Sequence, residues 1–144
     1  ILLLSPAGLA GKQPPIPPPL NYLGVYFLRQ KFVRERLCEN AFFNSKDAGS
    51  AEKQIASIHL NVPGWGMSLA AFASSGGVEI KEPLPNKVMK AIWGKEDKIL
   101  SKKVREKSQS FINCCFEELE NCGHLPHIDH PKLVAEYWER LVYE

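Results

Sequence analysis

The sequence has little net charge, few cysteines and no long hydrophobic run. Its 144 residues carry 18 Lys and Arg against 16 Asp and Glu, a formal net charge of +2. A net charge this small does not indicate a basic surface that binds nucleic acid or an anionic membrane. No apolar stretch approaches the roughly 20 residues that span a bilayer, so a transmembrane segment is not expected. With 44% apolar and 24% charged residues, the composition is that of one globular domain.

The 4 cysteines are too few for a chain of this size to be a disulfide-stabilised scaffold. Cys114 and Cys115 are adjacent, which disfavours pairing with each other. We therefore expect a reducing, intracellular location, either the cytoplasm or an organelle such as a plastid. Because the sequence begins at Ile1, inside an apolar run, we expect a piece of a longer protein. Any targeting segment is then expected upstream of it.

The first part of the sequence predicts one short strand followed by helices. Ile1 to Leu4 is typical of a buried strand, which Pro and Gly end within Ser5 to Gly8. The Pro-rich stretch Pro14 to Pro19 indicates extended polyproline II. A rigid connector is favoured there over a docking motif for an aromatic groove. Helices are predicted over residues 20–38, 51–60 and 67–73.

From residue 88 onward the pattern alternates between strands and helices. Val88 to Trp93 and Phe111 to Phe116 predict two buried strands. Ser101 to Ser108 predicts a helix whose first residue is the N-cap and whose basic face, including Arg105, is solvated or, less readily, binds phosphate. Pro131 begins an amphipathic helix. This βαβ pattern predicts an α/β fold with about three parallel strands and a helical insertion after the first.

Two ionisable side chains follow the predicted strands. Asp97 comes three residues after Gly94, and His124 directly follows Gly123. In open parallel sheets, ligands and catalytic side chains gather beyond the carboxyl ends of the strands. An Asp there can fix the tautomer of a neighbouring His and stabilise its protonated form, which is the acid and base pair of a nucleophilic hydrolase. The alternative is an exposed turn Asp and an unrelated loop His, since Gly-x-x-Asp and Gly-His are common strings.

The residues around this pair resemble the carboxyl-terminal signature of the α/β-hydrolase superfamily. The resemblance rests on Ala91 to Leu100 and Asn121 to Pro131, and on Leu3 to Gly8, which looks like the strand after the family's nucleophile helix. It implies the carboxyl-terminal part of an α/β-hydrolase fold, with flanking helices and a helical lid. It also implies that Asp97 is the triad acid and His124 the triad base, with no metal or organic cofactor.

The resemblance divides the chain into three parts. Residues 1–10 are the core strand and turn, residues 11–86 the Pro-rich connector and helical lid, and residues 87–144 the last two core strands and helices with the Asp and His loops. Asp129 stands where the family usually has Glu, at a position outside the triad.

The nucleophile elbow of the family, Gly-x-Ser-x-Gly between a strand and a helix, does not occur in this sequence. The nearest approach contains Ser68, which follows Pro63-Gly64 instead of a strand and lies too close in sequence to Asp97. Ser5 ends a strand without an elbow glycine before it. We therefore expect a fragment of a serine-type hydrolase that acts on an ester or related bond, with no activity from this chain alone.

Two other functions fit the same sequence. One is a non-catalytic, truncated protein whose lid binds an apolar ligand or partner. The other is a small zinc module, because one loop offers thiolate and imidazole ligands. These ligands are Cys122, His124, His127 and His130. Zinc sites usually pair ligands from two separated clusters, which favours the hydrolase. For the parent protein we expect a small apolar or ester substrate and no nucleic acid, and the sequence leaves the oligomeric state open.

Overall fold

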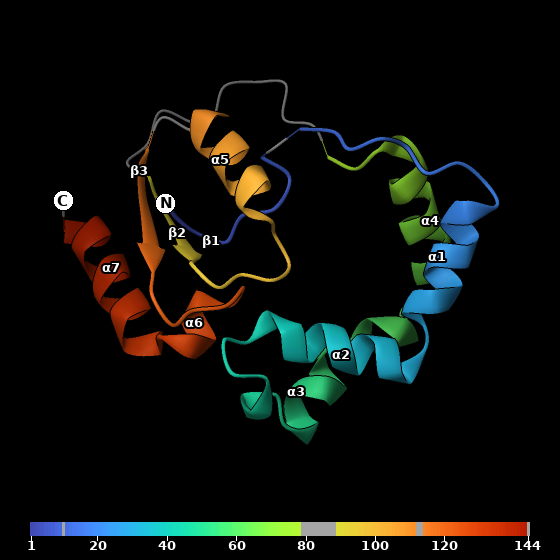
Figure 1. Ribbon diagram of the computed structural model, residues 1–144, viewed down its shortest axis with the longest axis horizontal. Helices are drawn as coiled ribbons and strands as arrows, with labels where there is room; N and C mark the ends of the chain where they lie inside the picture. The colour runs from blue at the N-terminus through green and yellow to red at the C-terminus, as the bar shows by residue number, and fades with distance from the viewer. Residues whose placement is uncertain (10, 79–88, 112–113, 144) are drawn as a thin grey trace.

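The computed structural model describes residues 1–144 except residues 10, 79–88, 112–113 and 144. In the described part, a small sheet with helices against it lies beside a layer made only of helices (Figure 1). The strands are β1 (Leu2–Leu4), β2 (Lys90–Gly94) and β3 (Cys115–Leu119). The α-helices are α1 (Leu20–Leu28), α2 (Lys31–Ala41), α3 (Ser50–Ile55), α4 (Trp65–Ser75), α5 (Lys102–Phe111), α6 (Pro126–Asp129) and α7 (Pro131–Tyr143). Two 3₁₀ helices, η1 (Ser45–Asp47) and η2 (Ile58–Asn61), complete the helical layer, which comprises α1 to α4 with η1 and η2.

The sheet is parallel, with the strand order β1-β2-β3. Leu3 is paired with Ala91, and Gly94 with Leu119. Because the carboxyl ends of parallel strands meet at one edge of a sheet, the loops after β2 and β3 leave it side by side. The predicted α/β fold with three parallel strands is confirmed.

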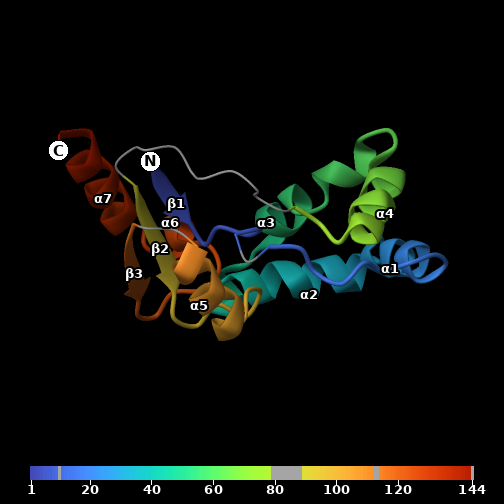
Figure 2. The same ribbon diagram turned by 90° about the horizontal axis from the view of Figure 1, so that it is seen from above.

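The two faces of the sheet are covered by different helices. α7 packs on one face, where its Tyr137 joins a core with Ile92, Leu119 and Cys122. α5 lies on the opposite side (Figures 1 and 2). Successive side chains of a strand alternate between the faces, so Trp93 points away from α7. Pro131 is the first residue of α7, as predicted.

The helical layer differs in detail from the prediction. The single helix predicted over residues 20–38 is two helices, because Gln30 has an extended backbone with φ −69° and ψ 131°. α1 packs on α4, whereas α2 packs on η1 and α3. These different partners are set by tertiary packing, which overrides local propensity. The helix predicted over residues 51–60 likewise divides into α3 and η2, and the one predicted over residues 67–73 lies within α4.

The predicted third strand begins too early. Phe111 is the last residue of α5, and β3 begins at Cys115. α5 extends to Phe111, beyond its predicted end, and the hydroxyls of Ser108 and Ser110 donate to carbonyl oxygens of the same helix, which accommodates these two residues inside it. Residues 112–113 of this strand and Val88 of the second lie outside the described residues. The expected boundaries between the three parts of the chain, at residue 10 and at residues 86 and 87, also lie outside the described residues. The three-part division therefore stays a prediction.

The Pro-rich connector runs along the end of α4. The N–H of Gln13 donates to the carbonyl of Gly76 (2.8 Å), and that of Ile16 donates to the carbonyl of Ala73 (3.0 Å). Backbone hydrogen bonds thus hold the connector to the helical layer. Across the described residues, we find no helix with the length and apolar character needed to cross a bilayer.

Candidate active site

Asp97 lies in the loop after β2, where backbone N–H groups hold one of its carboxylate oxygens. Oδ1 accepts hydrogen bonds from the N–H groups of Ile99 (2.8 Å) and Leu100 (2.9 Å). The side chain is 0% exposed. Because Oδ1 is used within its own loop, Oδ2 is left for a partner from another loop.

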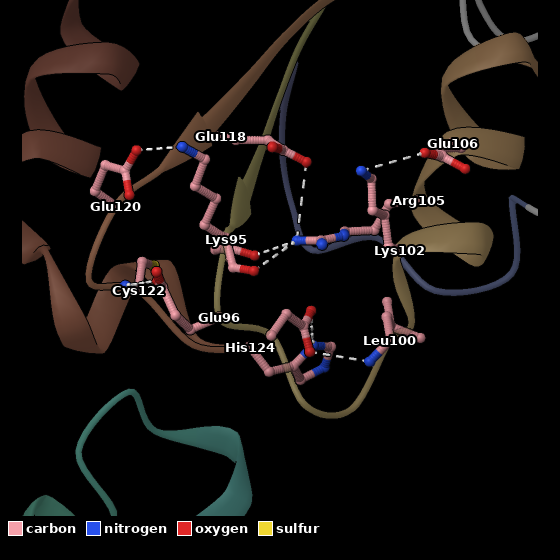
Figure 3. A network of polar contacts seen from close by, with 12 residues as sticks. Lys95, Glu96, Leu100, Lys102, Arg105, Glu106, Glu118, Glu120, Cys122 and His124 are labelled. Atoms are coloured by element: carbon pink, nitrogen blue, oxygen red, sulfur yellow. Dashed lines mark hydrogen bonds and ion pairs between the residues drawn. The ribbon is translucent and has the colours of Figure 1, made fainter.

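His124 lies in the loop after β3 (Figure 3), and its ring is hydrogen-bonded to Asp97. Its Nδ1 is 2.9 Å from Oδ2 of Asp97, and its side chain is 22% exposed. An ionised carboxylate can only accept a hydrogen bond, so Nδ1 carries the proton and donates it. Nε2 is then the ring nitrogen that can take up and release a proton. Asp97 and His124 are thus neighbours, and the hydrogen bond between them fixes the tautomer as the sequence led us to expect.

The pKa of Asp97 reflects two opposing effects. Burial raises it, because burial disfavours the charged form. The hydrogen bonds from His124 and from the N–H groups of Leu100 and Ile99 outweigh burial, and the pKa of Asp97 is lowered. His124 therefore faces an ionised carboxylate at neutral pH, which is the form that stabilises an imidazolium.

Two glycines allow the loops and the helical layer to meet through their backbones. A Cβ at Gly94 would lie 1.9 Å from the carbonyl oxygen of Gly123, and a Cβ at Gly123 would lie 2.7 Å from the carbonyl oxygen of Ala41. A side chain at either position therefore requires the backbone to move. Glu96 also ties the loops together: its N–H donates to the carbonyl of Cys122 (3.0 Å), and its carboxylate accepts from the N–H of Cys122 (3.0 Å).

Arg105 of α5 anchors the start of the Asp97 loop (Figure 3). Its guanidinium donates to the carbonyl of Gly94 (2.5 Å) and lies 3.9 Å from the carboxylate of Glu118 in β3. The Arg105 side chain is only 8% exposed. The expectation of a solvated basic face is therefore wrong for this residue, because its guanidinium is buried against the carbonyl of Gly94 and pairs with the carboxylate of Glu118.

Neither candidate serine has the setting of a nucleophile. Ser68 is an exposed residue in the first turn of α4, which follows η2 instead of a strand. Ser5 follows β1 with φ 40°, is 4% exposed, and its Oγ has no hydrogen-bond partner among the described residues. A hydroxyl so buried is not accessible to a substrate.

Three of the four ligands of the zinc alternative have separate surroundings. Burial, and then the nearby carboxylates of Asp129, Glu96 and Asp97, raise the pKa of the Cys122 thiol to about 12. His124 is bound to Asp97, and Nε2 of His130 lies 3.0 Å from the carbonyl oxygen of Asn121. In the described part of the chain, no group of three or more His, Cys, Asp or Glu is arranged to hold a metal ion.

Comparisons with known proteins agree with the fold. No family model matches the sequence. The α/β hydrolase domain-containing protein VTE7 of Arabidopsis thaliana is 25% identical over 130 residues, which cover 88% of this chain and 39% of that protein. The 2-hydroxy-6-oxo-6-phenylhexa-2,4-dienoate hydrolase of Rhodococcus sp. strain RHA1 is similar in structure, with a TM-score of 0.64 and 13% identity. The fold is that of the α/β-hydrolase superfamily.

A second α/β-hydrolase of known structure, a thermophilic esterase from Thermogutta terrifontis, has a TM-score of 0.65 and 18% identity to this chain. Both structural matches cover 99% of this chain and 54% of the other. The chain thus spans about half the length of these α/β-hydrolases and 39% of the curated relative.

Sequence reasoning missed three contributors to the site. They are Arg105, the Gly94 and Gly123 pair that lets the backbones meet, and Asp129, which binds backbone N–H groups of two segments. Gly94 and Gly123 were visible in the sequence as the glycines before Asp97 and His124, and Asp129 as a position of the family signature. Their contacts with other segments, and those of Arg105, were not visible.

Proposed function

We propose that this chain is the part of a serine-type α/β-hydrolase that carries the triad acid, Asp97, and the triad base, His124. The nucleophile and the oxyanion hole are then supplied by a segment outside this sequence. The hydrogen bond of 2.9 Å between Nδ1 of His124 and Oδ2 of Asp97, in the loops after β2 and β3, carries this proposal.

The chemistry that follows is acyl transfer to a serine. As the serine oxygen attacks the substrate carbonyl carbon, Nε2 of His124 takes the hydroxyl proton, and Asp97 stabilises the resulting imidazolium. His124 then returns the proton to the leaving oxygen as the ester C–O bond breaks. Water attacks the acyl-enzyme by the same route, with His124 again taking and returning the proton.

An apolar cavity supports a small apolar or ester substrate. It has a volume of about 410 Å³, within the range of small-molecule sites. Its lining joins three regions: Ile16 of the connector, Phe72 of α4, and Leu100 of the Asp97 loop. Leu100 is also the residue whose N–H donates to Asp97. The cavity and the acid thus share one loop.

A second candidate function is non-catalytic binding of an apolar ligand or partner by the helical layer. The observation that favours it is the exposure of large apolar side chains on α1, including Tyr22, Leu23, Tyr26 and Phe27. Folded monomers rarely expose a contiguous apolar patch without a function.

The proposed location is a reducing compartment inside the cell, either the cytoplasm or an organelle such as a plastid. The four cysteines support it, since all are free thiols: Cys38, Cys114, Cys115 and Cys122. Thiols are the expected state where glutathione keeps proteins reduced. Fractionation of the source cells, followed by detection with an antibody against this chain, tests the location.

The test of the hydrolase proposal begins with the transcript. We expect a Gly-x-Ser-x-Gly string upstream of Ile1, and hydrolysis of nitrophenyl esters by the longer product. In that product, Asp97→Asn and His124→Ala should each lower kcat by about 10⁴-fold. His127→Ala, at an exposed histidine of α6 three residues after His124, is the matched control and should leave kcat unchanged. A transcript without the elbow, or turnover that survives His124→Ala, favours the binding function instead.

A further inference from the structure

We propose that Asp129 is a positioning residue that latches residues 41–43 of the helical layer onto the His124 loop and thereby holds His124 against Asp97. The proposal rests on the function proposed above, since it concerns the orientation of the proposed base. We call the contact between Asp129, residues 41–43 and residues 123–124 the latch.

The carboxylate of Asp129, the last residue of α6, binds both sides of the latch. Its Oδ2 accepts from the N–H of Gly123 (2.7 Å), the residue directly before His124. The same carboxylate accepts from the N–H of Phe43, at 3.2 Å to Oδ2 and 3.4 Å to Oδ1. One side chain thus joins the loop after β3 to the segment that follows α2.

A direct backbone bond completes the latch. The N–H of His124 donates to the carbonyl oxygen of Ala41, the last residue of α2 (2.8 Å). The next residue, Phe42, is only 3% exposed, so this end of α2 is anchored by burial. The backbones of the His124 loop and of residues 41–43 can lie this close because residue 123 is a glycine. A Cβ at Gly123 would lie 2.7 Å from backbone atoms of residues 41–43.

These bonds fix the backbone from which the imidazole of His124 projects. The N–H groups of His124 and of the preceding residue are both held, one by Ala41 and one by Asp129. A charged acceptor makes its hydrogen bonds stronger than those of a neutral group. A shift of the helical layer relative to the sheet would therefore move the backbone of His124 and lengthen its bond to Asp97.

The latch is tested by NMR on the full ¹⁵N-labelled chain. The wild type should show a downfield Nδ1–H proton of His124, assigned by its loss in His124→Gln, and slow amide exchange at Gly123 and Phe43. Asp129→Asn keeps the size of the side chain but replaces one acceptor oxygen by an amide that only donates. We expect amide exchange at Gly123 or Phe43 to be about tenfold faster or more, and the Nδ1–H signal to be lost.

The control is Glu136→Gln, an exposed carboxylate on α7, which should change neither readout. Gly123→Ala breaks the latch from the other side and should also abolish the Nδ1–H signal. The latch is overturned if the signal survives in folded Asp129→Asn or Gly123→Ala protein. Rapid exchange of both amides in the wild type overturns it without any variant. Absence of the signal from the wild type instead overturns the acid and base pair itself.

Discussion

Asp97 shows how a single buried carboxylate can serve both stability and chemistry. One oxygen closes its own loop and the other orients His124. The side chain is shielded from solvent, so these hydrogen bonds replace its hydration. The same contacts that lower its pKa therefore couple the ionisation of the proposed acid to folding.

Acid should destabilise the protein through Asp97. Its pKa is lower in the folded chain than the value of about 3.9 in an unfolded one, so its contribution is complete above that value and is lost as pH falls through the folded pKa. We expect Asp97→Asn to lower the free energy of unfolding at neutral pH by about 1–3 kcal/mol. The difference from wild type should shrink below about pH 4. Urea unfolding at several pH values measures this, and a difference that does not change with pH contradicts it.

Cysteine reactivity should separate the buried thiol from the exposed one. The Cys122 side chain is fully buried and its thiol has a pKa of about 12, whereas Cys115 is exposed. Since the thiolate is the reactive form, a disulfide reagent should modify Cys115 in the folded protein and spare Cys122 until urea is added. Mass spectrometry of the labelled peptides shows which of the two cysteines is modified first. Equal rates at Cys115 and Cys122 in the folded protein argue against this environment.

At the scale of helices and strands, the sequence predicted the elements that are marked by a few neighbouring residues. The apolar run at Leu2–Leu4 and the proline at the start of α7 mark their elements directly. The break between α1 and α2 at Gln30 and the continuation of α5 to Phe111 have no comparable local signal in the sequence. The latch was not visible either, because Phe43 and Asp129 are 86 residues apart in the sequence.

The anchoring of the Asp97 loop by α5 gives a prediction at this scale. Arg105→Met keeps much of the apolar stem but removes the guanidinium donor to the carbonyl of Gly94, which then keeps only the longer hydrogen bond from the N–H of Asp97 (3.3 Å). We expect this loss to cost about 1–3 kcal/mol of unfolding free energy. Lys103→Met, at an exposed position of the same helix, is the matched control and should change stability by less than about 0.5 kcal/mol. Chemical unfolding of both variants compares them. If both variants lose the same unfolding free energy, the contact between Arg105 and Gly94 contributes nothing to stability.

At the scale of the whole molecule, the sequence predicted the superfamily fold and the pair of residues that the fold brings together. Asp97 and His124 were predictable because Asp97 comes three residues after Gly94, His124 directly follows Gly123, and parallel strands end at one edge. The substrate was not predictable. The cavity is formed by the connector, α4 and the Asp97 loop together, and its shape depends on how these segments pack.

The chain by itself should not turn over esters. Without an activated serine, His124 has no covalent route, and an imidazole alone accelerates ester hydrolysis only slightly. Short-chain nitrophenyl esters incubated with the purified chain should give no saturable rate above that of His124→Ala. A saturable rate that disappears in Ser68→Ala would identify Ser68 as the nucleophile and overturn the proposed division of the triad.

The most direct test of the central claim is covalent labelling of the longer gene product with a fluorophosphonate, a probe that reacts with activated serines. Mass spectrometry of the labelled peptide identifies the serine. We predict one labelled serine upstream of Ile1, within a Gly-x-Ser-x-Gly string, and labelling that is lost in His124→Ala and strongly slowed in Asp97→Asn. Labelling at Ser5 or Ser68, or labelling that is unchanged in His124→Ala, contradicts the account.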